Sequence, residues 1–216
     1  QKRFVRDSAH QLRTPLAVLK AQVQSAQRGD VPAQQALEEI NLTVDRATLL
    51  ANQMLSLAKV EQLRQQPESA TLDFANVVRG IALDLSPLMA DKALDVGIDT
   101  ETAPVHAHQW MLAELSRNLI HNAIKHSPPG GLLAIELRPH PGMAVLTVRD
   151  GGPGIPAELR QRLFAPFAAG DVAKGSGLGL AICKEIVNAL GGSLSLDNRP
   201  GGGLDATARL PLEVQQ

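Results

Sequence analysis

The first 63 residues carry apolar side chains at helical spacing, and this pattern constrains the fold more than any other feature. Between Phe4 and Arg28, steps of four and three residues separate the apolar positions Leu12, Leu16, Leu19, Val23 and Ala26. Such spacing is typical of an amphipathic helix with one buried stripe. Gly29, Asp30 and Pro32 follow, and they predict a helix end, a turn and a restart at the proline.

A second helix is predicted from Ala33 to about Glu61. Two interleaved seven-residue series run through it, Leu37, Val44, Ala51 and Ala58 in one and Ile40, Ala47 and Met54 in the other. Apolar repeats of this period are typical of coiled-coil-like seams. Two such helices cover each other's stripes poorly, so the pattern predicts a homodimer through residues 1–63, with a four-helix bundle. The alternative is that the rest of the same chain covers the stripe.

The length and composition of the chain indicate a second domain and exclude several classes of function. A chain of 216 residues with 44% hydrophobic content can bury a substantial core. The formal net charge of -1 gives no overall basic field for nucleic acid or an anionic membrane. The single cysteine, Cys183, excludes an internal disulfide framework and a multi-cysteine zinc site. No run of about 18 apolar residues predicts a membrane span, and the opening "QKRFVRDSAH", without an initiating Met, suggests a fragment of a longer protein.

The polar segment "QLRQQPESATLD", which contains Pro67, predicts a linker. The chain therefore divides into a hairpin at residues 1–63, a linker at 64–73 and a second domain at 74–216. In that domain we expect helices near 74–90, 109–125 and 178–190, and strands near 94–98, 132–139, 143–150, 191–198 and 202–210. Helices mixed with antiparallel strands predict an α/β sandwich with helices on one face of the sheet, so the whole chain belongs to the α+β class.

His10 stands apart from the apolar stripe of the first helix. At about 100° per residue, Leu12 lies about 200° around the helix from His10, so the imidazole is expected to face solvent or a partner. Arg13 and Thr14 flank it at i+3 and i+4. A neutral imidazole is a nucleophile, Arg13 can neutralise phosphoryl charge and Thr14 can hold a water, which suits a phosphate on His10. An ordinary surface histidine is the alternative, against which stands Pro15, since proline inside a helix usually marks a bend.

Polar residues in the segment "ELSRNLIHNAIKHS" share one face of a predicted helix. Asn118 and Asn122 are four residues apart, and Lys125 follows three residues later. An amide oxygen can coordinate Mg²⁺, and lysine can meet phosphate oxygens. A merely solvated helix face is the alternative.

Two glycine-rich segments complete the set. Asp150 ends a predicted strand before "GGPGIP", where a carboxylate could accept a hydrogen bond from an amine such as that of adenine, although a plain Gly-Pro turn explains the segment equally well. Gly175, Gly177 and Gly179 open a predicted helix, whose N-terminus favours phosphate. The second segment is neither a P-loop nor a dinucleotide-binding fingerprint.

Together and in this order, these segments resemble the catalytic core of a two-component sensor histidine kinase. "HQLRTPL" resembles the H-box, "NLIHNAIKHS" the N-box, "DGGPGI" the G1 box, "LFAPF" the F-box and "GSGLGL" the G2 box. The resemblance implies a phosphoacceptor hairpin followed by an ATP-binding domain of the Bergerat (GHKL) type. It also implies the cytoplasmic portion of an inner-membrane sensor protein, with no nucleic-acid partner and no membrane contact by this fragment.

The resemblance implies roles for the residues of these boxes. His10 would take the γ-phosphoryl group of ATP, with Gln11, Arg13 and Thr14 around it, and pass it to an aspartate of a response regulator receiver domain. Thr14, one turn from His10, also suggests a regulator phosphatase activity. Asn122 would coordinate Mg²⁺, and residues 157–175 would form a lid packed down by Phe164 and Phe167. The nucleotide site would comprise Asn118, Asn122, Lys125, His126, Asp150, Gly152, Gly154, Ile155, Phe164, Lys174, Gly175, Ser176, Gly177, Leu178, Gly179 and Leu180.

Three positions depart from the pattern of the family. Gln11 stands where an acidic residue commonly follows the histidine, and an amide stabilises an imidazolium less, so we expect slow autophosphorylation. His126 replaces a common tyrosine. No arginine follows the second phenylalanine of the lid, so either Lys174 takes over the γ-phosphate contact or nothing in the lid does.

Other functions fit part of the sequence. Hydrolytic ATPases of the same fold carry a glutamate four residues before the Mg²⁺-binding asparagine, and Asn118, which occupies that place, cannot act as a general base. Serine kinases of the anti-sigma class usually lack the hairpin. A non-catalytic, nucleotide-sensing dimeric scaffold is the third alternative, against which stand the asparagines, Asp150 and the glycines. The segment "RGDVP" leaves open whether transfer runs within or between protomers.

Overall fold

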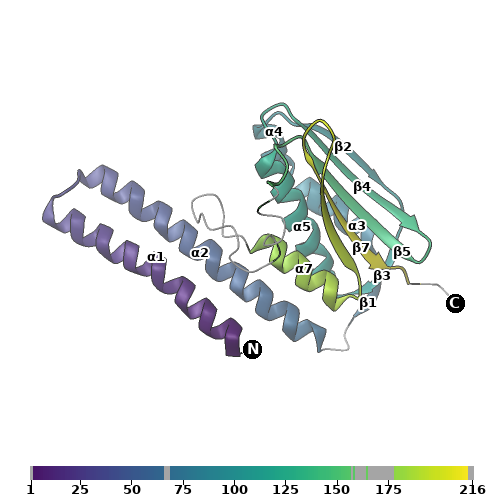
Figure 1. Ribbon diagram of the computed structural model, residues 1–216, viewed down its shortest axis with the longest axis horizontal. Helices are drawn as coiled ribbons and strands as arrows, with labels where there is room; N and C mark the ends of the chain where they lie inside the picture. The colour runs from purple at the N-terminus through teal and green to yellow at the C-terminus, as the bar shows by residue number, and fades with distance from the viewer. Residues whose placement is uncertain (1, 66–68, 157, 159–163, 165–177, 214–216) are drawn as a thin grey trace.

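The computed structural model describes residues 2–65, 69–156, 158, 164 and 178–213, and for residues 2–12 the backbone alone. A helical hairpin precedes a domain in which helices cover one face of a sheet (Figure 1). This arrangement confirms the predicted α+β class and the α/β sandwich. Across the described residues, no helix combines the length and the apolarity that crossing a membrane requires.

The hairpin consists of α1 (Lys2–Arg28) and α2 (Ala33–Arg64). Gly29 has a φ of +76°, a left-handed conformation that glycine adopts without steric cost. The Asp30 carboxylate accepts a hydrogen bond from Arg28 Nε at 2.9 Å, and Asp30 N donates to the backbone oxygen of Ser25. The predicted reversal is confirmed at this turn.

The face that α2 turns toward its own chain contains one of the two expected series, since Met54 is buried and Ile40 and Ala47 are half-buried. The other expected series is largely exposed, with Leu37 57% and Val44 42% exposed. In its place the buried side chains include a series shifted by one residue, Ala36, Thr43, Leu50 and Leu57. The heptad pattern places apolar residues at adjacent positions, so the pattern alone does not say which of them faces inward. Thr43 also joins the two helices, since its hydroxyl donates to Gln22 Oε1 at 2.9 Å.

The second domain contains a five-stranded sheet in the order β2-β4-β5-β7-β6. Its strands are β2 (Asp95–Thr100), β4 (Leu132–His140), β5 (Met143–Asp150), β6 (Ser193–Asn198) and β7 (Leu204–Pro211). β2 runs parallel to β4, and all other neighbours are antiparallel. The predicted hairpin of β4 and β5 is confirmed, and Gly142 with a φ of +75° lies in its turn.

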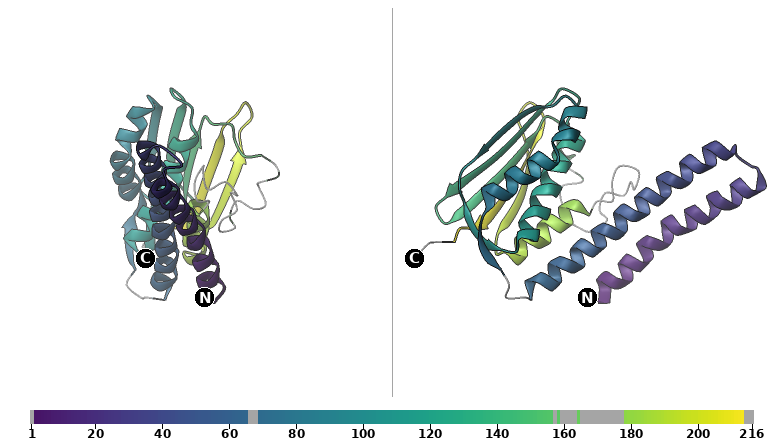
Figure 2. Two further views of the ribbon diagram at one scale, coloured as in Figure 1. Left: turned by 90° about the vertical axis from the view of Figure 1, so that its left-hand side faces the viewer. Right: turned by 180° about the vertical axis from the view of Figure 1, so that it is seen from behind.

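Helices α3 (Phe74–Asp84), α5 (Gln109–His126) and α7 (Gly179–Ala189) cover one face of this sheet (Figure 2). Their apolar residues share one core with the inward residues of the strands, such as Leu146 and Val148 of β5. The single helix expected over 74–90 is two helices, because α4 (Ser86–Asp91) begins anew after Leu85. Pro87 lacks an N–H and clashes with the preceding turn, which ends α3.

The segment expected as a linker contains a strand at its end. β1 (Ala70–Asp73) pairs antiparallel with β3 (Pro104–Ala107), a strand that the sequence did not predict. Leu72 and Val105 pack on the core, which stabilises this pairing between distant segments. Asp73 then caps α3, because its Oδ1 accepts hydrogen bonds from Ala75 N and Ala103 N, both at 3.1 Å.

The C-terminal half of α2 packs on the second domain. Leu50, Met54, Leu57 and Val60 belong to the same core cluster as α5 and α7. Lys59 Nζ lies 4.5 Å from the ring centroid of Trp110 on α5, a cation–π contact. In the right-hand view of Figure 2, α1 lies against α2 rather than against the sheet domain. The domain therefore covers part of the α2 stripe within one molecule, as in the alternative weighed above.

Candidate functional site

Helix α5 turns a polar face toward the start of α7. Asn118 and Asn122 lie one turn apart on α5, and both are half-buried. The Asn118 carboxamide donates to the backbone oxygen of Glu114 at 2.9 Å and to its carboxylate at 3.0 Å. A Cβ atom on Gly179, the first residue of α7, would lie 2.9 Å from Asn118 Oδ1. The absent side chain therefore allows the N-terminus of α7 to approach the amide face of α5.

Asp150 ends β5 on the side of the sheet that faces the helices. It continues the alternation that buries Leu146 and Val148, and it is itself only 4% exposed. Its carboxylate accepts a hydrogen bond from Gly152 N at 2.8 Å. Burial raises the pKa of Asp150, while the Gly152 N–H and His126 oppose that shift. A buried acceptor here suits a ligand that presents an amino group.

The turn after β5 fits closely against the end of α5. A Cβ atom on Gly152 would lie 2.7 Å from the backbone oxygen of His126 and 2.9 Å from Asp150 Oδ1. Partial burial lowers the pKa of His126, Lys125 lowers it further, and Asp150 raises it. Burial also lowers the pKa of Lys125. The end of α5 and the turn after β5 thus form one electrostatic cluster.

Lys92, just after α4, holds the C-terminus of α5. Its Nζ donates to the backbone oxygens of Ile124, Lys125 and Ser127 at 2.8, 2.9 and 3.0 Å. The last carbonyls of a helix have no partners within the helix, and a lysine can satisfy them. Lys92 therefore fixes the turn that carries Lys125 and His126.

The glycine-rich segment before α7 is described only at its end. Leu178 is buried, and Gly179 and Leu180 are half-buried. Four predicted phosphate contacts lie outside the described residues, namely Lys174, Gly175, Ser176 and Gly177.

Most of the predicted lid also lies outside the described residues, including Phe167. Phe164 is half-buried and packs against the core. Lys184 Nζ of α7 lies 5.8 Å from the centroid of its ring.

Two family models match the chain. The His Kinase A (phospho-acceptor) domain matches residues 1–63, and the histidine kinase-, DNA gyrase B- and HSP90-like ATPase family matches residues 108–214. The solved structure of the mycobacterial sensor histidine kinase MprB is 30% identical, covers 68% of this chain and 99% of its own, and has a TM-score of 0.61. The chain belongs to the sensor histidine kinase family. The Acinetobacter baumannii histidine kinase AdeS is similar over 95% of this chain and 98% of its own, with 26% identity and a TM-score of 0.76.

Curated relatives of this histidine kinase chain are longer proteins. Sensor protein QseC of Salmonella typhi is 33% identical over 97% of this chain and 47% of its own length. Sensor protein kinase PmrB of Pseudomonas aeruginosa is 33% identical over 98% of this chain and 46% of its own length. The chain thus spans about half the length of the curated relatives it matches.

The phosphoacceptor motif of the kinase lies on α1, within the matched His Kinase A domain. His10 and Gln11 lie on the described helix backbone, but their side chains are outside the description, so the predicted outward direction of the imidazole stays a prediction. Arg13 and Thr14 are exposed, and Pro15 lies inside the helix.

The structure brings several predicted nucleotide residues of the kinase together, and it adds others. The end of α5 lies against Gly152, where His126 is influenced by both Lys125 and Asp150. Asn118, farther back on α5, lies against Gly179 at the start of α7. Sequence reasoning missed Lys92, whose three acceptors lie 32 to 35 residues away. It also missed Asn198, whose partner is 43 residues away. The sequence around Asn198 predicts a turn, but it does not indicate that Asn198 pairs with Ile155.

Proposed function

We propose that this chain uses ATP to phosphorylate His10 and then transfers the phosphoryl group to an aspartate of a response regulator receiver domain. The observation that carries the proposal is the buried Asp150 carboxylate, which lies beside the C-terminal end of α5 in a chain that also has the phosphoacceptor motif on α1. ATP supplies the γ-phosphoryl group, and the family matches support its use.

The residues of the second domain would bind and orient the nucleotide. Asp150 accepts a hydrogen bond from the amino group of adenine, since an ionised carboxylate is an acceptor only. Gly152 and Gly154 let the backbone after Asp150 take the tight path that would border the base. The base and the ribose would also contact the apolar side chains of Ile155, Phe164 and Leu180.

The polar end of the site would hold the phosphates. Lys125 and His126 lie at the end of α5, and Leu178 and Gly179 lie at the start of α7, where backbone N–H groups favour anions. The phosphates would also contact four residues of the segment before α7, namely Lys174, Gly175, Ser176 and Gly177.

Asn122 would hold Mg²⁺, and Asn118 would line the nucleotide site beside it. Among the described residues, no group of three His, Cys, Asp or Glu side chains could hold a metal ion. Mg²⁺ commonly takes few protein ligands together with substrate phosphates, and an amide oxygen is a suitable ligand. The half-buried Asn122, one turn from Asn118, fits this donor set.

On α1, His10 would act as the nucleophile and Arg13 would neutralise phosphoryl charge. Gln11 would accept the N–H of the ring and set the tautomer, but more weakly than a carboxylate. Thr14 would position a water for a phosphatase reaction on the regulator. A receiver domain is supported as the partner by the family, in which a complex of histidine kinase ThkA with response regulator protein TrrA has been solved.

We also propose that the chain forms a homodimer through residues 1–63 and that it lies on the cytoplasmic side of an inner membrane. The dimer is supported by apolar side chains that this hairpin leaves exposed, among them Leu42 at 55% and Leu49 at 46%. The membrane anchor would lie in the part of the protein that corresponds to the other half of its longer relatives.

Incubation with ATP labelled at the γ-phosphate tests the proposal. The chain is expected to acquire label that is stable in alkali and lost in acid, as a phosphohistidine is, and His10→Ala is expected to acquire none. His140→Ala is the control, because His140 is an exposed histidine at the β4–β5 turn, and it should be labelled like the wild type. Label that persists in His10→Ala would contradict the proposal.

A further inference from the structure

The turn between β6 and β7 holds the loop that follows Asp150. Asn198 Oδ1 accepts a hydrogen bond from Ile155 N at 2.8 Å, and Asn198 Nδ2 donates to Ile155 O at 2.9 Å. One carboxamide thus pairs with both backbone groups of one residue, in the manner of a neighbouring strand. Ile155 has this pairing although it lies outside the sheet.

Gly154 is shaped to admit this contact. A Cβ atom at Gly154 would lie 2.9 Å from Asn198 Oδ1 and 3.0 Å from its Cγ. The φ of Gly154 is +74°, a conformation that residues with a side chain rarely adopt. The glycine therefore accommodates Asn198, and this requirement is separate from any approach of a ligand.

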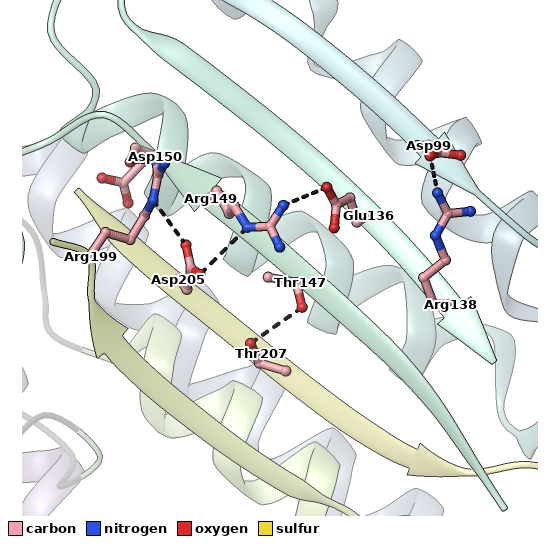
Figure 3. A network of polar contacts seen from close by, with 9 residues as sticks. All are labelled: Asp99, Glu136, Arg138, Thr147, Arg149, Asp150, Arg199, Asp205 and Thr207. Atoms are coloured by element: carbon pink, nitrogen blue, oxygen red, sulfur yellow. Dashed lines mark hydrogen bonds and ion pairs between the residues drawn. The ribbon is translucent and has the colours of Figure 1, made fainter. Parts of the chain in front are cut away.

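The same turn also fixes the other end of the loop. A Cβ atom at Gly203 would lie 2.2 Å from the backbone oxygen of Asp150, so β7 passes Asp150 in direct contact. Arg199 Nη1 donates to that oxygen at 3.5 Å, and Arg199 Nε lies 3.6 Å from Asp205 Oδ1 (Figure 3). Asp205 in turn pairs with Arg149 of β5 at 3.5 Å.

We propose that Asn198 is a positioning residue of the nucleotide site, which fixes Ile155 and thereby the path of the 150–155 loop beneath the base. This inference rests on the proposed function, because it assigns the loop to nucleotide binding. Asn198 touches the backbone of the loop and no reacting atom. Its loss should therefore weaken the binding of nucleotide and leave the transfer step nearly unchanged.

Two substitutions in the 216-residue chain separate a positioning role from simple space filling. Asn198→Ala removes both hydrogen bonds and is expected to raise the Kd for ADP and the KM for ATP about five-fold, with kcat within about two-fold. Asn198→Asp keeps the shape but sets an anionic oxygen against Ile155 O. It is therefore expected to weaken ADP binding at least as much as Asn198→Ala at pH 8.

Acidification gives a readout that a purely structural role would not produce. A protonated carboxyl can donate to Ile155 O, so the ADP affinity of Asn198→Asp, taken relative to the wild type at each pH, should recover as the pH falls through the pKa of that carboxyl. Asn188→Ala is the matched control, because Asn188 is an exposed asparagine on α7, and it should bind ADP like the wild type.

Each outcome decides between the two proposals. If the wild type does not bind ADP, the proposed function fails. If the wild type binds ADP and Asn198→Asp binds it equally well at pH 8, only the role of Asn198 is overturned. If Asn198→Ala does not fold, as judged by circular dichroism, the isosteric Asn198→Asp variant decides alone.

Discussion

Two residues shape the part of the proposed site that would bind the adenine base, one by the absence of a side chain and one by its carboxyl group. Gly152 has no side chain, and the space that a Cβ atom would need is occupied by His126 O and Asp150 Oδ1. Asp150 is buried, and burial raises its pKa, so its carboxyl group takes up a proton at a higher pH than an exposed aspartate would. The site therefore combines a tight backbone with a buried acid.

We expect Gly152→Ala to weaken ADP binding more than ten-fold, because the added methyl group must displace the end of α5 or the Asp150 carboxylate. Isothermal titration with ADP measures this effect. Gly97→Ala is the control, because a Cβ atom there meets nothing within 4 Å, and its ADP affinity should match that of the wild type. Equal affinities of both variants would contradict the close fit assigned to Gly152.

At the scale of elements, α5 is held at its C-terminal end by Lys92, the residue that follows α4. Three backbone oxygens of α5 or the residue after it share the ammonium group of Lys92. Because Asn118, Asn122 and Lys125 all lie on α5, the position of this helix end affects every one of them. The stability of the domain and the geometry of the site are thus linked through one side chain.

Lys92→Met keeps most of the apolar stem of the side chain and removes all three hydrogen bonds. We expect it to lower the free energy of unfolding by about 1–3 kcal/mol and to raise the Kd for ADP several-fold. Urea denaturation and ADP titration measure the two effects. Lys20→Met, at an exposed position of α1, should change neither. An unchanged free energy of unfolding in Lys92→Met would contradict the capping role.

The elements with local signals could be predicted from the sequence, whereas those made by distant contacts could not. Apolar spacing and turn residues located α5 and the hairpin of β4 and β5. β3 escaped prediction because four residues that pair with Ala70–Asp73, more than thirty residues away, leave no local pattern. The contacts of Lys92 and Asn198 span similar distances. In the same way, the box motifs indicated the residues of the candidate site, whereas the turn that holds the 150–155 loop could be seen only in the fold.

At the scale of the whole molecule, the hairpin has two apolar surfaces with different uses. One side of α2 packs on the second domain through Leu50, Met54 and Leu57. Other large apolar side chains of the hairpin stay exposed in the single chain, including Leu42 and Leu49. An exposed apolar stripe of this extent is typical of an interface, and a second copy of the hairpin supplies a matching surface.

We expect the double variant Leu42→Asp, Leu49→Asp to shift the chain from dimer to monomer in sedimentation velocity, because charged side chains would be buried in the interface. Leu83→Asp is the matched control, because Leu83 is 74% exposed on α3, outside the hairpin, and it should leave the dimer intact. A wild-type chain that sediments as a monomer would contradict the dimer.

The position of α2 has a mechanical consequence. Two members of the series that packs inward, Leu50 and Leu57, are each followed by a smaller residue, Ala51 and Ala58. A twist of α2 about its long axis by the angle of one residue, about 100°, would replace two leucines by two alanines at the boundary with the nucleotide-binding half. Such a rotation of α2 would therefore reduce the apolar contact between the hairpin and that half.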